Sequence, residues 1–147
     1  MTVKAILSLK GGTVATIEPG ASLATAAKVL AERWIGALVV TDSGNRVVGM
    51  LSERDIVRAL AERGPAALDT RIDRAMTRSA VTCTETMTVS EVMKRMTASR
   101  SRHIPVLEFG RLVGIVSIGD VVKYRLATMQ HESQSMREYV GAESHTR

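Results

Sequence analysis

The 147-residue chain has a single cysteine, Cys83, and only 3% of its residues are aromatic. One cysteine excludes an intramolecular disulfide and any cysteine-rich metal site, and its threonine-rich, strand-like surroundings favour a structural thiol over a reactive one. So few aromatic side chains leave little material for the base-stacking platforms that hold single-stranded nucleic acid. The composition therefore disfavours two common classes of binding protein.

Long hydrophobic runs are also missing. The longest spans residues 35–40, far fewer than the roughly 18 residues that a membrane span needs. The amino terminus has one early lysine, Lys4, and an apolar stretch that Ser8 and Lys10 interrupt, which is too weak for a secretory signal. We therefore expect a cytoplasmic protein with no membrane association. With 45% hydrophobic and 24% charged residues, the chain should be globular and bury a real core.

The common signatures of enzyme chemistry are not found. Two of the three histidines, His131 and His145, lie in a polar tail, and there is no metal-ligand spacing, Walker loop or Gly-x-Gly-x-x-Gly string. We therefore predict a protein that is not an enzyme and needs no metal. The formal net charge of +5 permits an anionic partner without identifying one.

The chain does contain an internal repeat. Residues 49–57 (GMLSERDIV) align with residues 114–122 (GIVSIGDVV), and residues 37–40 align with residues 104–107. The two alignments differ by two residues, and the difference falls in a turn, where changes of length are tolerated. The repeat predicts two copies of one structural unit.

Each copy is predicted to fold as β-α-β-β-α. A short β-branched stretch, 14–17 or 81–84, precedes a helix that starts at Ser22 or Thr88, and both helices have apolar residues at positions i, i+3, i+4 and i+7. Thr88 and Glu91 match a capping box. Two strands and a second helix follow in each copy; the expected strands are 37–41, 47–51, 104–107 and 112–116, and the second helices open at Ser52 and Ser117.

The predicted fold class is therefore α/β (α+β), with two tandem repeats. We expect domains at residues 8–66 and 75–131, joined by a partly helical linker, and a polar tail at 132–147 that adds one last amphipathic turn. A half of about 60 residues is marginally stable alone, so the two copies should pack together.

The strand-helix junctions carry the same polar string, Gly-x-x-Ser-x-x-Asp, which ends at Asp55 in the first copy and at Asp120 in the second. In one interpretation Ser52 and Ser117 cap the helices, and the aspartates lie near the positive end of the helix dipole. In the other, the carboxylate accepts two hydrogen bonds from the vicinal diol of a ribose, and the hydroxyl and helix-terminal amides meet its sugar or phosphate. We favour ribose binding for Asp120 and leave both interpretations open for Asp55.

The second copy adds Arg102 and His103 at the entrance to its middle strand. A guanidinium suits phosphate, and a nearby phosphate would raise the proton affinity of a histidine, although a solvated strand end is the alternative. The matching positions in the first copy are Ile35 and Gly36. We therefore expect two unequal clefts, with the cationic clamp in only one of them unless Arg54 supplies it in the other.

These strings, in this order and duplicated, resemble a tandem cystathionine-β-synthase (CBS) domain pair, or Bateman module, over roughly residues 10–130. The matching strings are Val14-x-Thr16-Ile17-x-Pro19, residues 49–55 (GMLSERD), residues 102–106 (RHIPV) and residues 114–120 (GIVSIGD). The resemblance implies a pseudo-two-fold disc whose two clefts bind adenosine-containing ligands such as AMP, ADP, ATP, NAD or S-adenosylmethionine. It also implies that two discs stack as a homodimer.

The resemblance assigns roles to individual residues. The junction aspartates would hold ribose, Arg102 and His103 would hold phosphate, and the adenine pocket would be lined from the other domain by Thr16 and Ile17 or by Thr82 and Thr84. Two departures from the family pattern make equal occupancy doubtful. The second copy has no proline to match Pro19, and Gly119 stands where the first copy has Arg54.

The leading hypothesis is a regulatory sensor of adenine nucleotides. No effector domain is visible in the sequence, so we expect it to signal to a partner protein in trans. A structural dimerisation module with degenerate clefts is one alternative. A basic nucleic-acid-binding protein is another, disfavoured because the positive residues are scattered among acidic neighbours.

Overall fold

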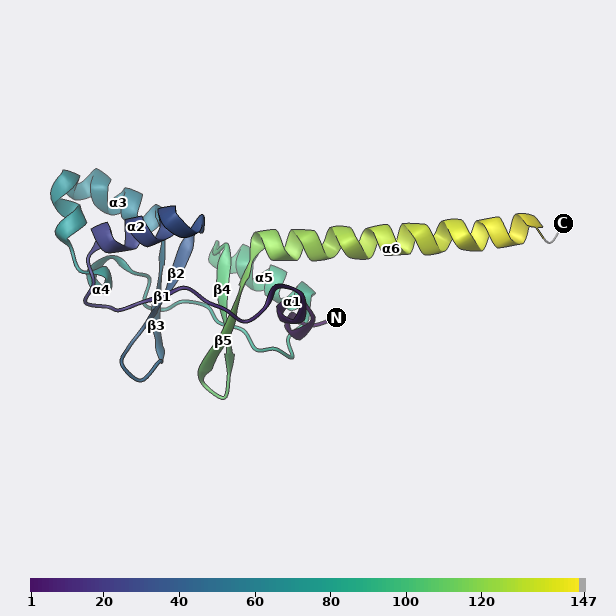
Figure 1. The fold of residues 1–147 in the computed structure, drawn as a ribbon, viewed down its shortest axis with the longest axis horizontal. Coiled ribbons are helices and arrows are strands. Elements are labelled where there is room, and N and C mark those ends of the chain that lie inside the picture. The colour runs from purple at the N-terminus through teal and green to yellow at the C-terminus, as the bar shows by residue number, and fades with distance from the viewer. Residues whose placement is uncertain (146–147) are drawn as a thin grey trace.

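The computed structural model describes the backbone of residues 1–145 and the side chains of residues 1–138. Two small sheets stand side by side, helices cover each of them, and the last helix projects far beyond the second (Figure 1). The mixed α/β class predicted from the sequence is confirmed. No helix in this described part is long and apolar enough to cross a lipid bilayer.

The first repeat has the predicted order. It consists of β1 (Thr16–Ile17), α2 (Leu23–Arg33), β2 (Ala37–Thr41), β3 (Val47–Ser52) and α3 (Glu53–Arg63). Strand β1 pairs in parallel with β2, which pairs antiparallel with β3. Helix α2 begins where the Ser22 hydroxyl accepts a hydrogen bond from the Thr25 amide (3.2 Å), an N-cap. Its buried face, Leu23, Ala26 and Leu30, packs onto the sheet.

The second repeat follows the same plan with a weaker first strand. Its elements are α5 (Val89–Ser99), β4 (His103–Glu108), β5 (Arg111–Ser117) and α6 (Ile118–His145). The predicted strand at 81–84 is reduced to one parallel bridge between Cys83 and Val106. The Thr88 hydroxyl accepts from the Glu91 amide (3.1 Å), so only half of the predicted capping box is present; the backbone of Thr88 instead bridges to Thr2.

Two helical segments are exchanged between the repeats. Helix α1 (Val3–Lys10), which the sequence analysis did not predict, precedes the first repeat but packs into the core of the second. The linker contains a 3-10 helix, η1 (Gly64–Asp69), and α4 (Ile72–Ala75), which precedes the second repeat but packs on the first. The segment that precedes each repeat therefore packs on the other repeat, and these contacts hold the two repeats together.

The two glycines of the repeated junction string, Gly49 and Gly114, lie directly against these exchanged segments. Gly49 and Gly114 lie opposite Val40 and Val106 in their hairpins. A Cβ atom at Gly49 would lie 2.8 Å from the sulfur of Met76, and one at Gly114 would lie 2.6 Å from Leu7 Cδ2. Any side chain at either position would therefore displace the neighbouring segment.

The sheets also meet directly. Ala37, Val39 and Met50 of the first sheet form a buried cluster with Leu112 and Ile115 of the second. This cluster is the predicted packing of the two halves, and it places the carboxyl end of β3 and the start of β4 at a common seam.

Helix α6 differs from the sequence expectation. A domain end near residue 131, followed by one further helical turn, was expected, but the helix runs without interruption from Ile118 to His145. The expected tail is thus a continuation of the last domain helix.

Candidate functional site

Two clefts lie along the seam between the repeats. The first, of about 580 Å³, contains the Asp55 junction; the second, of about 480 Å³, contains Lys10 and Ser117. The first cleft is lined by Gly36, Ala37, Met50, residues 52–55, Arg58, Thr77, Ala80, Val81 and residues 99–103. The second is lined by Lys10, residues 13–15, residues 33–37, His103, Ile115 and Ser117.

Asp55 is a helix-capping residue and also lines the first cleft. Its Oδ2 accepts hydrogen bonds from the Ser52 amide (2.8 Å) and the Ser52 hydroxyl (3.1 Å), and its own amide donates to that hydroxyl (3.4 Å). Asp55 is buried, and its side chain is 9% exposed. Within the described residues no hydrogen bond reaches Oδ1, which faces only Arg58 Nη1 at 3.9 Å. The helix cap therefore uses Oδ2 and leaves Oδ1 available to accept a further hydrogen bond.

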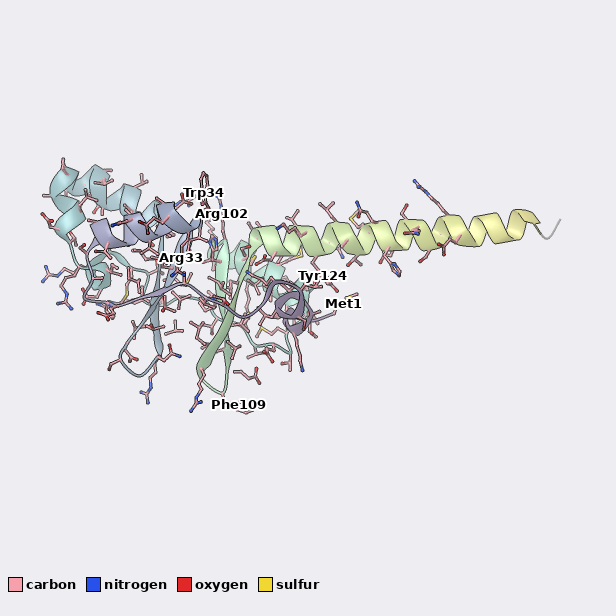
Figure 2. The ribbon with its side chains drawn as sticks, viewed as in Figure 1. Met1, Arg33, Trp34, Arg102, Phe109 and Tyr124 are labelled. Atoms are coloured by element: carbon pink, nitrogen blue, oxygen red, sulfur yellow. The ribbon has the colours of Figure 1, made fainter. Side chains whose placement is uncertain are left out.

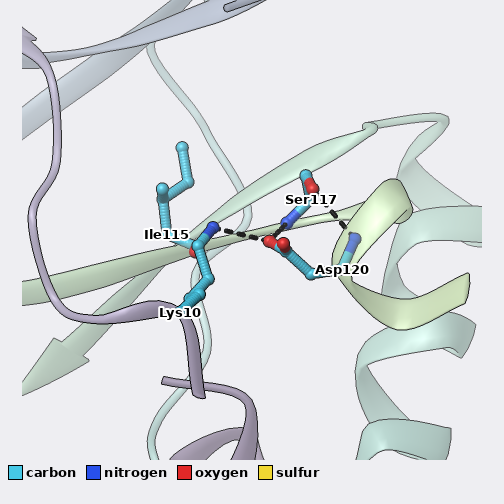
Figure 3. Close-up of polar contacts among 4 residues, drawn as sticks. All are labelled: Lys10, Ile115, Ser117 and Asp120. Atoms are coloured by element: carbon cyan, nitrogen blue, oxygen red, sulfur yellow. Dashed lines mark hydrogen bonds and ion pairs between the residues drawn. The ribbon is translucent and has the colours of Figure 1, made fainter. Parts of the chain in front are cut away.

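Asp120 repeats the cap and adds an ion pair (Figure 3). Its Oδ2 accepts from the Ser117 amide (2.8 Å) and from Lys10 Nζ (2.6 Å). Lys10 also donates to the carbonyl of Ile115 (2.9 Å). Burial raises the pKa of Asp120, but the hydrogen bonds from Lys10 and Ser117 outweigh it, so the pKa lies below its ordinary value. The chain thus places its own ammonium on the carboxylate that the sequence analysis favoured for ribose.

Lys10 is a site residue that was not predicted from the sequence. It comes from α1, which packs on the second repeat, and the hydrogen bond joins residues 110 positions apart. The available signal was the apolar spacing of Val3, Ile6 and Leu7, which is a short helical face ending just before the lysine.

The cationic clamp lies in a different cleft from the one expected. The sequence placed Arg102 with the Asp120 junction, but the structure places it in the lining of the first cleft, with Asp55. Three more arginines, Arg54, Arg58 and Arg100, line the same cleft, against two carboxylates. The physical reason is that the start of β4 faces the first repeat across the seam, so the second copy supplies charge to the first copy's junction.

His103 lines both clefts. Its counterpart in the first repeat, Gly36, has no side chain, and a Cβ there would lie 2.7 Å from Glu53 Oε1 and 3.4 Å from His103 Cε1. Burial, reinforced by the positive charge of Lys10, lowers the pKa of His103, and Asp120 and Glu53 offset only part of that shift. His103 is therefore predominantly neutral at pH 7, and an anion in either cleft would favour its protonated form.

The threonines of the first strands lie beside the clefts instead of lining them. Thr16 and Ile17 form β1, and Thr82 and Thr84 flank the bridge at Cys83. The linings instead include the preceding residues, 13–15 in the second cleft and 80–81 in the first. The predicted residues are thus adjacent to the clefts, and the residues that line them lie a few positions earlier in the chain.

The second cleft has an unusual rim. Trp34, the only tryptophan of the chain, ends α2 in the left-handed conformation (φ 55°) and is 94% exposed. It lies at the end of α2 next to Arg33, and both line this cleft; Figure 2 shows the indole projecting from the surface. An aromatic plane near two cations, Arg33 and Lys10, can hold a planar anionic ligand.

Neither metal nor thiol chemistry is indicated in the described part of the chain. No group of three or more histidine, cysteine, aspartate or glutamate side chains there could hold a metal ion. Cys83 is 2% exposed, and burial raises its pKa to about 11, so the thiolate that reacts with electrophiles is scarce at neutral pH.

Comparison with known proteins identifies similar chains. A family model described as the CBS domain matches residues 12–62 and again residues 71–127. Among solved structures, a CBS-domain containing protein from Agrobacterium tumefaciens is 46% identical, with a TM-score of 0.83 over 85% of this chain and 99% of that chain. An uncharacterized 17.7 kDa protein of Acidianus ambivalens is 39% identical over 75% of this chain. The match spans 66% of that relative, just under two thirds of its length.

Some of the similar structures contain ligands. The CBS domain pair of protein MJ0100, solved in complex with 5′-methylthioadenosine and S-adenosyl-L-methionine, is 29% identical to this chain. The TM-score is 0.78, and the match covers 87% of this chain and 98% of that chain.

Proposed function

Because this chain belongs to the CBS-domain family and has two tandem CBS domains, we propose that it is a non-catalytic regulatory sensor that binds an adenosine-containing nucleotide at the seam between them. AMP, ADP, ATP and NAD are the candidate ligands. The observation that carries the proposal is the first cleft, where a buried carboxylate with one unused oxygen stands among four arginines.

The first cleft offers a complementary group for each part of a nucleotide. Asp55 Oδ1 is available to accept from the ribose hydroxyls, as the carboxylate of a sugar site does. Arg102 and Arg54 present guanidinium groups to the phosphates. The adenine would lie against Ala80 and Val81, which precede the segment of Thr82 and Thr84 assigned to it by family resemblance.

The second cleft offers a weaker ribose site in this proposal. Its junction carboxylate, Asp120, is already paired with Lys10, so a sugar would have to compete with an ammonium at 2.6 Å. The other proposed ligand-binding residues of this cleft are Ser117 and His103, which line it. Thr16 and Ile17 are proposed to lie beside the ligand. The MJ0100 pair supports the general ligand class, because both of its named ligands contain an adenosine group.

The remaining parts of the proposal concern how the signal leaves the protein. A ligand that binds two arrangements of the domains with different affinity shifts their equilibrium, and a partner protein in trans would read the change. We propose a homodimer, a cytoplasmic location, and domain limits at 8–66 and 75–131.

Calorimetric titration of the purified full chain with AMP, ADP, ATP, NAD and S-adenosylmethionine tests the proposal. At least one should bind and raise the melting temperature, because a ligand that binds only the native state stabilises it. Arg102→Gln should weaken that ligand about ten-fold, since a charge-assisted hydrogen bond is lost. Arg111→Gln is the matched control, because Arg111 is exposed at the start of β5 and lines neither cleft.

The expected result is binding that Arg102→Gln weakens and Arg111→Gln preserves. Absence of binding to every adenosyl compound at millimolar concentration, with no shift in melting temperature, would overturn the sensor proposal and favour a structural dimerisation module.

A further inference from the structure

Helix α6 has two distinct faces. Near its start, Val121, Tyr124 and Thr128 face the body: Val121 is 2% exposed and the other two are partly buried. From Met129 to residue 138 every side chain is exposed, and Figures 1 and 2 show no other element beside this part of the helix. The family match ends at residue 127, so the projecting part is an addition to the CBS-domain pair.

An apolar stripe follows the face that points away from the body. It consists of Val122, Leu126, Met129 and Met136, which are 50–67% exposed. Their spacing alternates between four and three residues, with Ser133 in the remaining position. This is the a/d pattern of a coiled coil, in which Leu126 and Ser133 take the a positions and Val122, Met129 and Met136 the d positions. The body-facing residues take the c and f positions, on the opposite side of the helix.

The projecting helix needs a partner to be stable. In proteins most of a helix's stability comes from tertiary packing of an apolar face, and not from helix propensity alone. The described chain supplies no such packing beyond residue 128. The stripe is therefore the natural surface for an intermolecular helix contact.

We propose that this stripe pairs with the same stripe of a second copy of the chain, as a parallel, in-register two-stranded coiled coil. In that register every apolar residue of the stripe meets its own copy. Glu132 occupies a g position and Arg137 the e position five residues later, so each Glu132 lies beside Arg137 of the partner subunit. Two interhelical ion pairs of the kind that select partner and orientation result.

The antiparallel arrangement is less complementary. With the fullest overlap of the two helices, Met129 would meet Ser133 of the partner subunit, and the two Glu132 carboxylates would face each other. Like charges at such flanking positions destabilise a helix pair. Parallel pairing also places both CBS bodies at the same end, where the exposed Ile118 continues the contact toward the body.

Single-cysteine crosslinking of the full chain tests the pairing and its direction. The native Cys83 is buried and unreactive, so a thiol introduced on α6 is the reactive one. Val122→Cys, Met129→Cys and Met136→Cys should each form a disulfide-linked dimer under mild oxidation. Ser135→Cys, an exposed c position outside the stripe, is the control and should remain largely monomeric on a denaturing gel.

Each result decides the proposal. Crosslinking at all three stripe positions, with little at Ser135, supports parallel pairing. In the antiparallel register Met129 faces Ser133 and not its own copy, so absence of crosslinking at the stripe positions overturns the proposal, as does equal crosslinking at Ser135. No ligand is involved, so the outcome is independent of whether nucleotides bind.

A charge exchange provides a second measurement. Glu132→Arg should weaken the dimer about five-fold in sedimentation equilibrium, because two exposed ion pairs become repulsive contacts. Adding Arg137→Glu to that variant should restore the wild-type dissociation constant. If the double variant is no tighter than Glu132→Arg, the two side chains are not partners and the parallel register is wrong.

Discussion

Lys10 Nζ lies 2.6 Å from Oδ2 of Asp120, although 110 residues separate them in the sequence. The pair joins the helix that precedes the first CBS domain to the junction that begins the last helix of the second. The same carboxylate oxygen also caps that helix. Helix capping and domain packing therefore meet on one atom beside the second cleft, whose lining includes Lys10 and Ser117. In the first cleft, among the described residues, the one cation near the Asp55 carboxylate is Arg58, at 3.9 Å.

Lys10→Met should lower the unfolding free energy by roughly 1 kcal/mol at pH 7, because the partly buried ion pair with Asp120 and the hydrogen bond to the Ile115 carbonyl are lost while the apolar stem is kept. Lys4→Met is the control, since Lys4 is exposed on the same helix. Chemical denaturation measures both. Equal effects of the two substitutions would show that the contact with Asp120 contributes nothing.

The effect of Lys10→Met should also depend on pH. The pKa of Asp120 is lowered in the folded state, so its unfolded state binds more protons as the medium becomes acidic. The stabilisation is therefore present above the unfolded pKa of about 4 and is lost as the pH falls through the folded pKa. The stabilities of the wild type and Lys10→Met should converge in that range, and a constant difference down to the acid limit would contradict the assignment.

Asp55→Asn should reduce nucleotide affinity more than Asp120→Asn, by about ten-fold for the first substitution. The amide keeps an acceptor oxygen for the Ser52 cap but removes the charge that a ribose diol requires. From the sequence, Asp120 was expected to matter more than Asp55. The reverse is expected from the structure, because the Asp120 carboxylate is already paired with Lys10. Asp69→Asn is a control at an exposed position outside both clefts, and calorimetry in which Asp120→Asn shows the larger loss would restore the earlier order.

The duplicated junctions were predictable because their chemistry is local. A serine three residues before an aspartate at the start of a helix specifies a cap by hydrogen bonds within one turn, and both Ser52–Asp55 and Ser117–Asp120 form it. The strands and the helix starts follow from apolar periodicity, which is equally local. Family membership follows from the order of these local strings.

The distribution of charge between the clefts could not be predicted in the same way. Arg102 lines the same cleft as Asp55, and Lys10 reaches Asp120, only because each repeat receives residues from the other across the seam. Such contacts depend on the packing of the two domains, which no single stretch of sequence encodes. The length of α6 was missed for a related reason: its exposed part has no core partner within the chain, and its polar composition indicated a tail.

Trp34 provides a direct test of which cleft fills first. It is the sole tryptophan and lines only the second cleft. Binding to the first cleft should therefore leave its emission unchanged, while a ligand that enters the second should quench or shift it. In parallel titrations we expect the tighter calorimetric event without a fluorescence change. A change in emission that coincides with the tighter event would place the better site in the second cleft.

Nucleotide binding should take up protons through His103. Burial and the charge of Lys10 lower its pKa in the free protein, so it is neutral near pH 7, and a bound phosphate favours the charged form and raises the pKa again. Affinity should therefore increase as the pH falls through the region of the ordinary histidine pKa, about 6.5, because the complex holds a proton that the free protein does not.

Calorimetry at pH 6.5 in two buffers with different ionisation enthalpies measures this uptake. The wild type should show a buffer-dependent binding enthalpy that corresponds to net proton binding. In His103→Gln the dependence should disappear, while Arg111→Gln retains it because Arg111 lies outside both clefts. Proton release on binding, or uptake that persists in His103→Gln, would mean that the phosphate does not lie within the field of this histidine.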